Sequence, residues 1–275
     1  MSKIEISPFL KWAGGKRQLL PEIKKYIPDN INTYYEPFIG AGAVFLDLQP
    51  SKAVINDINY ELINCYKVIR DKPEELILEL SKFKNTEEDF YRIRSWDREK
   101  DYKKRSDVEK AARTIYLNKT CFNGLYRVNS KGFFNVPYGK YKNPAFINKE
   151  NIDNLSKYLK SANVTLLNKD FEEVLKNAGK GDFVYFDPPY FPLNKTSSFT
   201  NYSKDGFTEK DQVRLKEKID ELTNKGVLCL VSNSCCDFIK DLYKKYKIIE
   251  ISAKRNINSE GSKRQPVKEV LIKNF

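Results

Sequence analysis

The stretch Phe183-Val184-Tyr185-Phe186-Asp187-Pro188-Pro189-Tyr190 decides how the rest of the chain is interpreted. Its four leading apolar residues predict a short buried strand. The strand ends at Asp187, because neither proline can donate a hydrogen bond to a neighbouring strand. Residues 187–190, here called the corner, then hold a carboxylate, backbone carbonyls and an aromatic ring in place. Such an arrangement suits a flat ligand ring with an amino group. Tyr190 can stack on that ring while Asp187 and the Pro188 carbonyl accept its N–H hydrogens; an ordinary strand end with a rigid turn is the alternative.

The bulk composition is that of a globular chain with a polyanionic partner. Of its 275 residues, 40% are hydrophobic and 31% charged, so neither disorder nor a membrane protein is indicated. No apolar run approaches the roughly 20 residues needed to cross a bilayer, and the N-terminus lacks the apolar core of a signal peptide, so we expect a cytoplasmic protein. The formal net charge of +12 favours a nucleic-acid partner, with a generally lysine-rich composition as the alternative.

Missing residue types exclude several kinds of chemistry. The chain has no histidine, which excludes Ser-His-Asp and Cys-His nucleophiles and histidine-based metal sites. Its five cysteines show no C-x-x-C spacing, so neither zinc nor a disulfide framework is indicated, and we expect no metal. Carboxylates, aromatic rings and a bound cofactor must therefore carry the chemistry.

The segment Phe9-Leu10-Lys11-Trp12-Ala13-Gly14-Gly15-Lys16-Arg17 is a candidate ligand-binding loop. A glycine pair before a helix lets backbone amides approach an anion. Lys16 could pair with a carboxylate, and Trp12 could cover an apolar or cationic ligand. A Walker A phosphate loop does not fit, because Arg17 stands where Ser or Thr should follow the lysine. A plain loop into an amphipathic helix is the alternative.

Two further strand ends predict a site for a nucleoside cofactor. A strand over 33–38 runs into Ile39-Gly40-Ala41-Gly42, and a glycine-bearing turn after a first strand is where α/β folds bind adenosine-containing cofactors. Phe45 occupies the third glycine position of G-x-G-x-x-G, so a dinucleotide site is not favoured. The next strand, over 53–57, ends in Asp57, about 20 residues after the first strand, as expected for a carboxylate that binds ribose hydroxyls.

Helical patterns replace the strands between about residues 59 and 118. Apolar residues recur at helical spacing in three segments, and Pro73 fits the first turn of the second. The charged stretch 91–100 is expected to face solvent. Because this insert interrupts the alternation of strands and helices, we interpret it as a separate subdomain.

The insert ends in a candidate nucleic-acid hairpin. Two β-like runs, 118–129 and 133–142, flank Ser130-Lys131-Gly132, which predicts a hairpin over about 122–142. Basic and aromatic residues interleave along it. Such a ribbon could enter a DNA groove, with Arg127 reading a guanine edge and aromatic rings wedging between bases. A surface hairpin with extended basic side chains is the alternative.

The α/β pattern resumes after the hairpin. A strand over 164–170 ends in Asp170, a short helix follows, and the Asp187 strand comes next. The polar stretch 191–207 suits a loop beside the site, and Thr208 with Asp211 caps a further helix. The remaining predicted segments are strands over 226–231, 248–251 and 267–272 and a basic loop over 254–264.

With these pieces in order, the whole chain resembles the DNA adenine methylase family, D12-class enzymes that methylate adenine N6 in GATC. The matching motifs are 9–16, Glu36-Pro37-Phe38 with Gly40 and Gly42, Asn56-Asp57, 123–127, 134–139, 187–190 and 268–272. The resemblance implies an α/β fold: a Rossmann-like S-adenosylmethionine (AdoMet)-dependent methyltransferase sheet from residues 1–58 and 146–275. A mainly helical DNA-recognition subdomain with a β-hairpin, residues 59–145, would interrupt it. Double-stranded DNA as substrate, S-adenosylhomocysteine as product, association with the nucleoid and action as a monomer are also implied.

The resemblance carries site roles over to matching positions. Asp187 would lie between cofactor and target base, and Pro188, Pro189 and Tyr190 would complete the catalytic corner. Cofactor contacts are implied for Trp12, Ala13, Gly14, Gly15, Lys16, Glu36, Pro37, Phe38, Gly40, Gly42, Asp57, Asp170 and Asp187. DNA contacts are implied for Lys11, Phe122, Asn123, Gly124, Leu125, Arg127, Asn135, Pro137 and Lys140. Phe122 and Lys140 depart from the family pattern, which has tyrosine and arginine there, and lysine does not reproduce the bidentate contacts of arginine.

The implied mechanism begins with the target adenine flipped out of the duplex, because its N6 cannot be reached inside the stack. Asp187 and the Pro188 carbonyl would then accept the N6 hydrogens and aim the nitrogen at the sulfonium methyl, so that alignment and electrostatics supply the catalysis. Three alternatives stay open: the same chemistry on another sequence, an RNA or protein amino-methyltransferase, and a non-catalytic DNA-binding regulator. The biological role, in restriction–modification, a phage or chromosome maintenance, also stays open.

Overall fold

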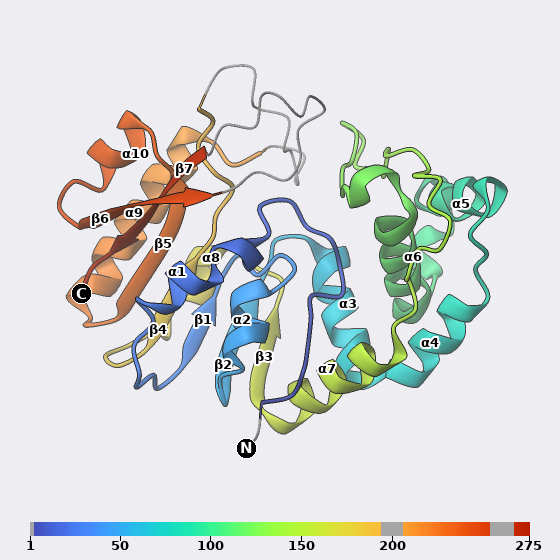
Figure 1. Cartoon of the computed structure of the whole chain (residues 1–275), viewed down its shortest axis with the longest axis horizontal. Coiled ribbons are helices and arrows are strands. Elements are labelled where there is room, and N and C mark those ends of the chain that lie inside the picture. The colour runs from blue at the N-terminus through green and yellow to red at the C-terminus, as the bar shows by residue number, and fades with distance from the viewer. Residues whose placement is uncertain (1–2, 194–205, 254–266) are drawn as a thin grey trace.

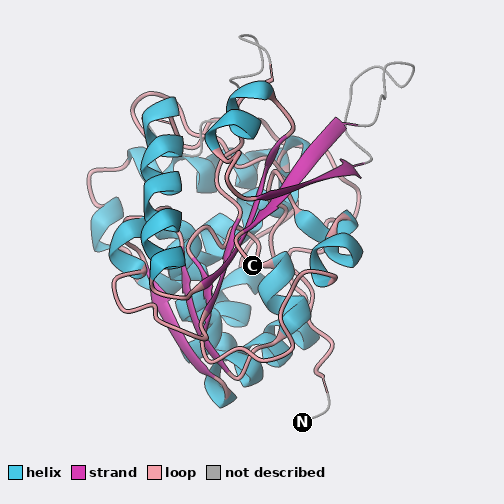
Figure 2. Cartoon of the chain, turned by 90° about the vertical axis from the view of Figure 1, so that its left-hand side faces the viewer, coloured by secondary structure: helices cyan, strands magenta, loops and turns pink. Residues whose placement is uncertain are grey.

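The parallel strands lie in the middle of the molecule, with helices on both sides of the twisted sheet (Figures 1 and 2). The computed structural model describes residues 3–193, 206–253 and 267–275. Most of the polar loop predicted over 191–207, and all of the basic loop predicted over 254–264, lie outside these residues. Within the described ranges, no helix is long and apolar enough to cross a membrane.

Seven strands of the described chain form one sheet in the order β3-β2-β1-β4-β5-β7-β6. The pairings from β3 through β5 are parallel, whereas β7 runs antiparallel to both β5 and β6. The predicted α/β class is therefore confirmed. The strands are β1 Tyr34–Glu36, β2 Lys52–Asn56, β3 Asn163–Leu167, β4 Phe183–Phe186, β5 Leu228–Ser234, β6 Lys247–Ala253 and β7 Val267–Lys273.

The direction of chain progression reverses between β1 and β4. From β1 the chain continues through β2 to β3 on one side, and from β4 it continues to β5 on the other. Tyr34 pairs with Phe183 and Tyr35 with Val184, so the two strands end side by side. In open α/β sheets, ligands bind at the carboxyl ends of the strands at such a switch point. The fold thus places the corner after β4 where a binding site is expected.

Side chains of β4 alternate between two apolar clusters, as expected for a strand covered on both faces. Phe183 and Tyr185 join a cluster with helices α1, α2, α3 and α7, which extends into the helical insert. Val184 and Phe186 join a second cluster with α8, α9 and α10. The bounds of these helices are α1 Leu20–Lys24, α2 Ala43–Leu48, α3 Tyr60–Asp71, α7 Lys149–Ser161, α8 Phe171–Val174, α9 Glu209–Asn224 and α10 Asp237–Leu242.

Two predicted helix starts are present in the structure. Pro73 occupies the first turn of helix α4 (Pro73–Ser81), where its missing N–H costs no hydrogen bond. Thr208 and Asp211 form a reciprocal capping box at the start of α9, because each side chain accepts a hydrogen bond from the other residue's backbone N–H. Both signals therefore fix helix boundaries in the fold.

The helical insert lies to the right of the sheet in Figure 1 and contains α4 Pro73–Ser81, α5 Glu87–Arg94 and α6 Asp107–Thr120. Most of the stretch 91–100 is exposed, as predicted, but two of its residues are buried. Ile93 and Trp96, three residues apart on one side of a helical segment, are 0% and 6% exposed. Asp97 makes a buried ion pair with Arg113 at 2.7 Å. Ile93 and Trp96 form an i, i+3 apolar pair that joins the same hydrophobic cluster as α6.

The 122–142 loop reverses where the hairpin was predicted, but it contains no regular strand. Two isolated bridges, Cys121 with Tyr138 and Val128 with Phe134, replace the ladder. The reversal is held by the Asn129 side chain, which accepts hydrogen bonds from the backbone N–H groups of residues 131 and 133 at 3.0 Å. The loop starts with a 3-10 turn in which Asn123 has a positive φ, and Pro137 has no backbone N–H to donate. A continuous ladder of strand hydrogen bonds therefore cannot form.

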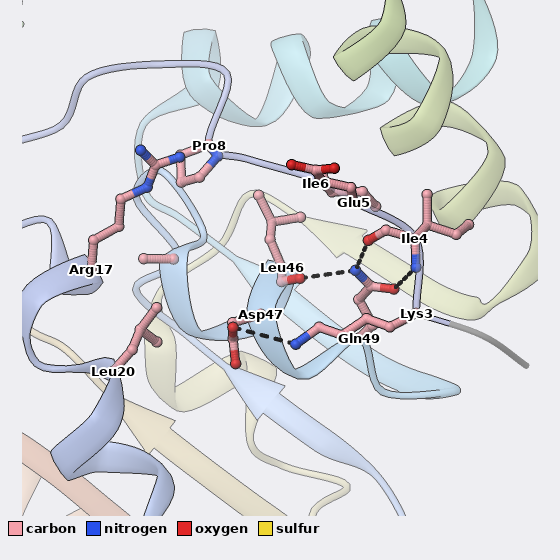
Figure 3. Close-up of a pocket in the computed structure, with 11 residues that line it drawn as sticks. Lys3, Ile4, Glu5, Ile6, Pro8, Arg17, Leu20, Leu46, Asp47 and Gln49 are labelled. Atoms are coloured by element: carbon pink, nitrogen blue, oxygen red, sulfur yellow. Dashed lines mark hydrogen bonds and ion pairs between the residues drawn. The ribbon is translucent and has the colours of Figure 1, made fainter.

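Residues 3–12 form an extended segment that three carboxamide side chains pin in place. Each carboxamide accepts from the N–H and donates to the carbonyl of one residue in the segment, at 2.6–3.1 Å. The pairs are Gln49 with Ile4 (Figure 3), Asn151 with Ser7, and Asn118 with Lys11. The main chain that enters the glycine loop is therefore fixed from three separate elements.

Candidate active site

A cavity lies at the carboxyl ends of β1 and β4. It gathers residues from the N-terminal loop, the turn after β1 and the corner after β4, which are far apart in the sequence. The predicted site residues that line it are Trp12, Ala13, Gly14, Gly15, Lys16, Glu36, Gly40, Gly42 and Asp187; Ile39, Ala41, Ala43 and Val44 complete the lining.

An ion pair joins two of these segments. Lys16 Nζ lies 2.8 Å from Asp187 Oδ1 and also donates to the Gly14 carbonyl at 2.6 Å. The Lys16 side chain is only 5% exposed. The predicted pairing of Lys16 with a carboxylate is therefore confirmed. Burial raises the pKa of the Asp187 carboxyl to about 6, and the Lys16 charge opposes that rise.

The Tyr190 ring lies beside this pair. Lys16 Nζ is 4.6 Å from the ring centroid, a cation–π distance. The Tyr190 hydroxyl donates to Glu269 Oε2 at 2.7 Å. Burial and the nearby Asp187 carboxylate raise the pKa of Tyr190 well above its usual range, so the hydroxyl stays protonated. Glu269 thus fixes the ring from β7, on the far side of β5.

A buried amide pair holds the backbone of the corner. Gln212 Nε2 donates to the Pro189 carbonyl at 2.9 Å, and Asn233 Nδ2 donates to Gln212 Oε1 at 3.0 Å. Asn233 Oδ1 in turn accepts from the Phe191 N–H at 3.1 Å. The Pro188 carbonyl accepts no hydrogen bond from any described residue, so it is available to a ligand.

The glycine turn after β1 is built around Asp57. Gly40 N–H donates to Asp57 Oδ2 at 3.1 Å, and Asn59 N–H donates to Oδ1 at 2.9 Å. Gly40 has a φ of 49°, and a Cβ there would lie 2.9 Å from Trp12 Cδ1, so the close approach requires glycine. Burial raises the pKa of Asp57 to about 6. Each carboxylate oxygen keeps a further lone pair, which fits the hydroxyls of a ribose.

Glu36 contributes a second buried carboxyl to the cavity. It accepts a hydrogen bond from the Tyr34 hydroxyl at 2.5 Å. Burial raises its pKa well above the usual range, and the neighbouring Asp187 charge adds to the rise. Both effects favour the protonated form of the Glu36 carboxyl.

Three other predicted cofactor residues flank the cavity without lining it. Phe38 packs against Phe171, with ring centroids 5.5 Å apart. The Pro37 carbonyl accepts a hydrogen bond from Asn56 at 3.0 Å. Asp170 caps the start of α8 and pairs with Arg214 at 3.2 Å. These residues lie at the same edge of the sheet, one strand or more away from the Lys16–Asp187 pair.

The predicted DNA residues cluster on the 122–142 loop. Phe122 and Leu125 are 52% and 38% exposed, which is unusual for large apolar side chains. Arg127 Nε donates to Asn135 Oδ1 at 2.8 Å, so two predicted contact residues hold one another across the loop. Lys140 has a positive φ of 54°. The remaining predicted residues here are Asn123, Gly124 and Pro137, and Lys11 packs against Gly124 from the N-terminal segment.

Sequence reasoning missed the supporting roles of several polar residues. Gln212, Asn233 and Asn56 are each 0–1% exposed. Gln212 and Asn56 donate to backbone carbonyls around the site, and Asn233 donates to the Gln212 side chain. Glu269 was noted only as part of a motif. A polar residue that continues an apolar strand, such as Asn233 in β5, is the signal that could have found them.

A second hollow lies between the extended N-terminal segment and α2, and Figure 3 shows its lining. Asp47 pairs there with Lys3 at 3.3 Å and with Lys24 at 3.0 Å. None of the predicted site residues lines this hollow. The switch-point cavity, with its buried carboxylates, is the better candidate for chemistry.

The mostly parallel sheet, with a cavity at its switch point, is consistent with a Rossmann-like methyltransferase. The chain belongs to the D12 class of N6 adenine-specific DNA methyltransferases, because the model of that family matches residues 12–257. The prediction of an adenine-specific DNA methyltransferase is thereby confirmed.

Three relatives match the chain over nearly their whole lengths. The chain is 48% identical to the type II methyltransferase M1.LlaDCHI of Lactococcus lactis subsp. cremoris, covering 100% of this chain and 97% of the relative. It is 45% identical to the type II methyltransferase M.MjaIII of Methanocaldococcus jannaschii, covering 99% and 100%. It is 34% identical to the DNA adenine methylase of Escherichia coli strain K12, covering 96% and 93%.

Proposed function

We propose that the enzyme transfers a methyl group from AdoMet to N6 of the adenine in GATC within double-stranded DNA. The observation that carries this proposal is the position of the Asp187 corner directly beside the glycine-lined cavity. A donor in the cavity and an amino group at the corner would then be neighbours. Trp12, Lys16, Gly40 and Asp57 would hold the donor, whose role is to supply an electrophilic methyl group on a sulfonium sulfur.

The catalytic roles follow from the hydrogen-bonding capacity of the corner. Asp187 is largely ionised at neutral pH, since its pKa is about 6. Together with the Pro188 carbonyl it can accept both N6 hydrogens of adenine, which draws the nitrogen lone pair out of conjugation with the ring. Tyr190 would stack on the base, and Glu269 and the Gln212–Asn233 pair would keep the corner rigid. Alignment then lowers the barrier without a covalent enzyme intermediate.

Flipping of the target base is part of the proposal. The corner is buried at the sheet edge, so adenine can reach it only outside the stack, at a cost of a few kcal/mol. Phe122 and Leu125, which are exposed on the 122–142 loop, would fill the gap that the base leaves. A duplex with 2-aminopurine at the target position tests this: its fluorescence should rise on binding, and an unchanged signal from bound duplex would contradict flipping.

The substrate class can be tested by supplying tritiated AdoMet with duplex DNA, single-stranded DNA and RNA of one sequence. Label confined to the duplex supports the proposal. Label in RNA would favour the RNA amino-methyltransferase alternative, and binding of duplex without transfer would favour a non-catalytic regulator.

We further propose that residues 59–145 form the DNA-recognition subdomain and residues 1–58 and 146–275 the catalytic one. The enzyme would act as a monomer in the cytoplasm, at the nucleoid. Relatives at 48% and 45% identity carry type II methyltransferase names, which favours a restriction–modification role. Such a role predicts that expression protects host DNA from an endonuclease that adenine methylation in GATC blocks.

A further inference from the structure

Two segments are in direct contact: residues 11–16, of which 12–16 line the cofactor cavity, and the 122–142 loop proposed to read DNA. The contact consists of Lys11 and Trp12 on one side and Gly124 and Tyr126 on the other, with Asn118 of α6 between them. We call these five residues the joint.

Asn118 is the buried centre of the joint, with 0% exposure. Its carboxamide accepts from the Lys11 N–H at 2.8 Å and donates to the Lys11 carbonyl at 2.8 Å. The same amide nitrogen donates to the Gly124 carbonyl at 3.1 Å. A Cβ on Gly124 would lie 2.9 Å from Lys11 Cβ, so the two main chains approach as closely as glycine permits. One side chain therefore sets the positions of both segments.

Two aromatic rings form the rest of the joint. Trp12 stacks on Tyr126 with ring centroids 5.1 Å apart and planes at 29°. Trp12 also lines the cofactor cavity and contacts the glycine turn at Gly40. Tyr126 packs on Phe134 in the other arm of the loop at 5.8 Å. The rings thus form an unbroken series of contacts from the cavity wall to the loop.

A ligand in the cavity would contact Trp12, and DNA bound to the loop would contact the segment that contains Tyr126. We propose that Tyr126 is a positioning residue that couples the two sites, so that cofactor and DNA each raise the affinity of the enzyme for the other. The inference rests on the proposed function. By linkage, both enhancement factors must be equal.

The coupling factor can be measured without catalysis. The affinity for S-adenosylhomocysteine is determined by calorimetry with and without a GATC duplex, and the affinity for the duplex with and without S-adenosylhomocysteine. We expect a factor of at least about fivefold in the wild type, falling to within about twofold of unity in Tyr126→Leu. Tyr126→Phe keeps the ring and should keep the factor. Tyr91→Leu, which removes a 37% exposed ring of α5 outside the joint, is the matched control and should also keep it.

The outcomes separate this inference from the proposed function. A wild-type factor in Tyr126→Leu, or equal losses in Tyr126→Leu and Tyr126→Phe, would overturn the role of the ring stack. A wild type that binds both ligands without coupling overturns this inference alone. A wild type that binds neither ligand overturns the proposed function and this inference with it.

A second measurement leaves the joint intact and does not depend on Tyr126→Leu folding. Trp12 and Trp96 are the two tryptophans of the chain, so Trp96→Phe leaves Trp12 as the single indole fluorophore. Its emission should change when duplex binds in the absence of cofactor. Unchanged Trp12 emission in protein that has bound duplex would contradict the proposal.

Discussion

Lys16 Nζ lies 2.8 Å from Asp187 Oδ1, and this ion pair connects the glycine loop at the start of the chain to the corner after β4. The Lys16 side chain is 5% exposed and that of Asp187 19%, so solvent screens the pair weakly. Burial alone would favour a neutral Asp187, whereas the lysine favours the carboxylate that the proposed mechanism needs. The pair therefore sets the protonation state of the site.

Removal of the Lys16 charge should move the pH dependence of catalysis. Burial raises the pKa of Asp187 to about 6 and Lys16 lowers it, so in Lys16→Met the pKa should rise further. Because the carboxylate is the proposed hydrogen-bond acceptor, kcat should fall on the acid side of about pH 6 in the wild type and at higher pH in the variant. Lys24→Met, which removes a cation paired with Asp47 outside the cavity, should leave the pH at which kcat falls unchanged. If kcat fell at the same pH in Lys16→Met as in the wild type, the proposed role of the ion pair would be contradicted.

Asp187→Ala should abolish methyl transfer and leave much of DNA binding, since the loop proposed to bind DNA is a separate element. Loss of a positioned group of this kind typically costs about 100-fold or more in kcat. Single-turnover transfer and a duplex-binding titration on the same preparation measure both quantities. Normal turnover in this variant would show that the mechanism is wrong.

Asp57→Ala should weaken binding of S-adenosylhomocysteine. A hydrogen bond to a charged group is worth about 1.5–3 kcal/mol, which corresponds to at least a tenfold loss of affinity. Calorimetric titration measures it. Asp47→Ala is the matched control, because Asp47 is a carboxylate of α2 that faces the second hollow. Equal affinities of Asp57→Ala and the wild type for S-adenosylhomocysteine would contradict the assignment of Asp57 to the cofactor site.

Arg127→Ala should relax sequence choice at one base pair, at a cost of about 1–3 kcal/mol in discrimination. The measurement compares kcat/KM on GATC and on duplexes with single substitutions in that sequence. Lys131→Ala, at the exposed tip of the same loop, should change rates on all duplexes alike. Unchanged selectivity in Arg127→Ala would contradict its assignment to base reading.

Gln212→Leu should lower the free energy of unfolding by about 1–3 kcal/mol, because a buried carbonyl and a buried amide lose their partner. The carbonyl is that of Pro189 and the amide is that of Asn233. Denaturant titration measures the change, and kcat should fall as the corner loosens. A variant with unchanged stability and kcat would show that the corner does not need this support.

Local patterns in the sequence predicted the strands of the sheet and most of the residues that line its switch-point cavity. β4 was predicted because four apolar residues precede a carboxylate and two prolines, and β1 and β2 because each ends at a turn signal. Helices α7 and α10 were not predicted, although Ile152, Leu155 and Leu159 of α7 are buried at helical spacing. The predicted hairpin is present as a chain reversal with isolated antiparallel bridges, and positive φ at Asn123 and a proline at 137 interrupt a regular ladder.

Contacts between distant elements could not be predicted in the same way. Tyr190 and Glu269 are 79 residues apart, and they meet only because β7 pairs antiparallel to β5. Likewise, the contact of the Lys11 backbone with Asn118 spans 107 residues. A single sequence shows that such polar residues are present, but it does not show which residues they contact, because those contacts depend on the strand order.

The most direct test is AdoMet-dependent methyl transfer to two duplexes that differ only in GATC versus GTTC. The account predicts N6-methyladenine in the GATC duplex alone. Equal transfer to both would contradict the proposed sequence reading, and no transfer to either would contradict the assignment of AdoMet and duplex DNA as substrates.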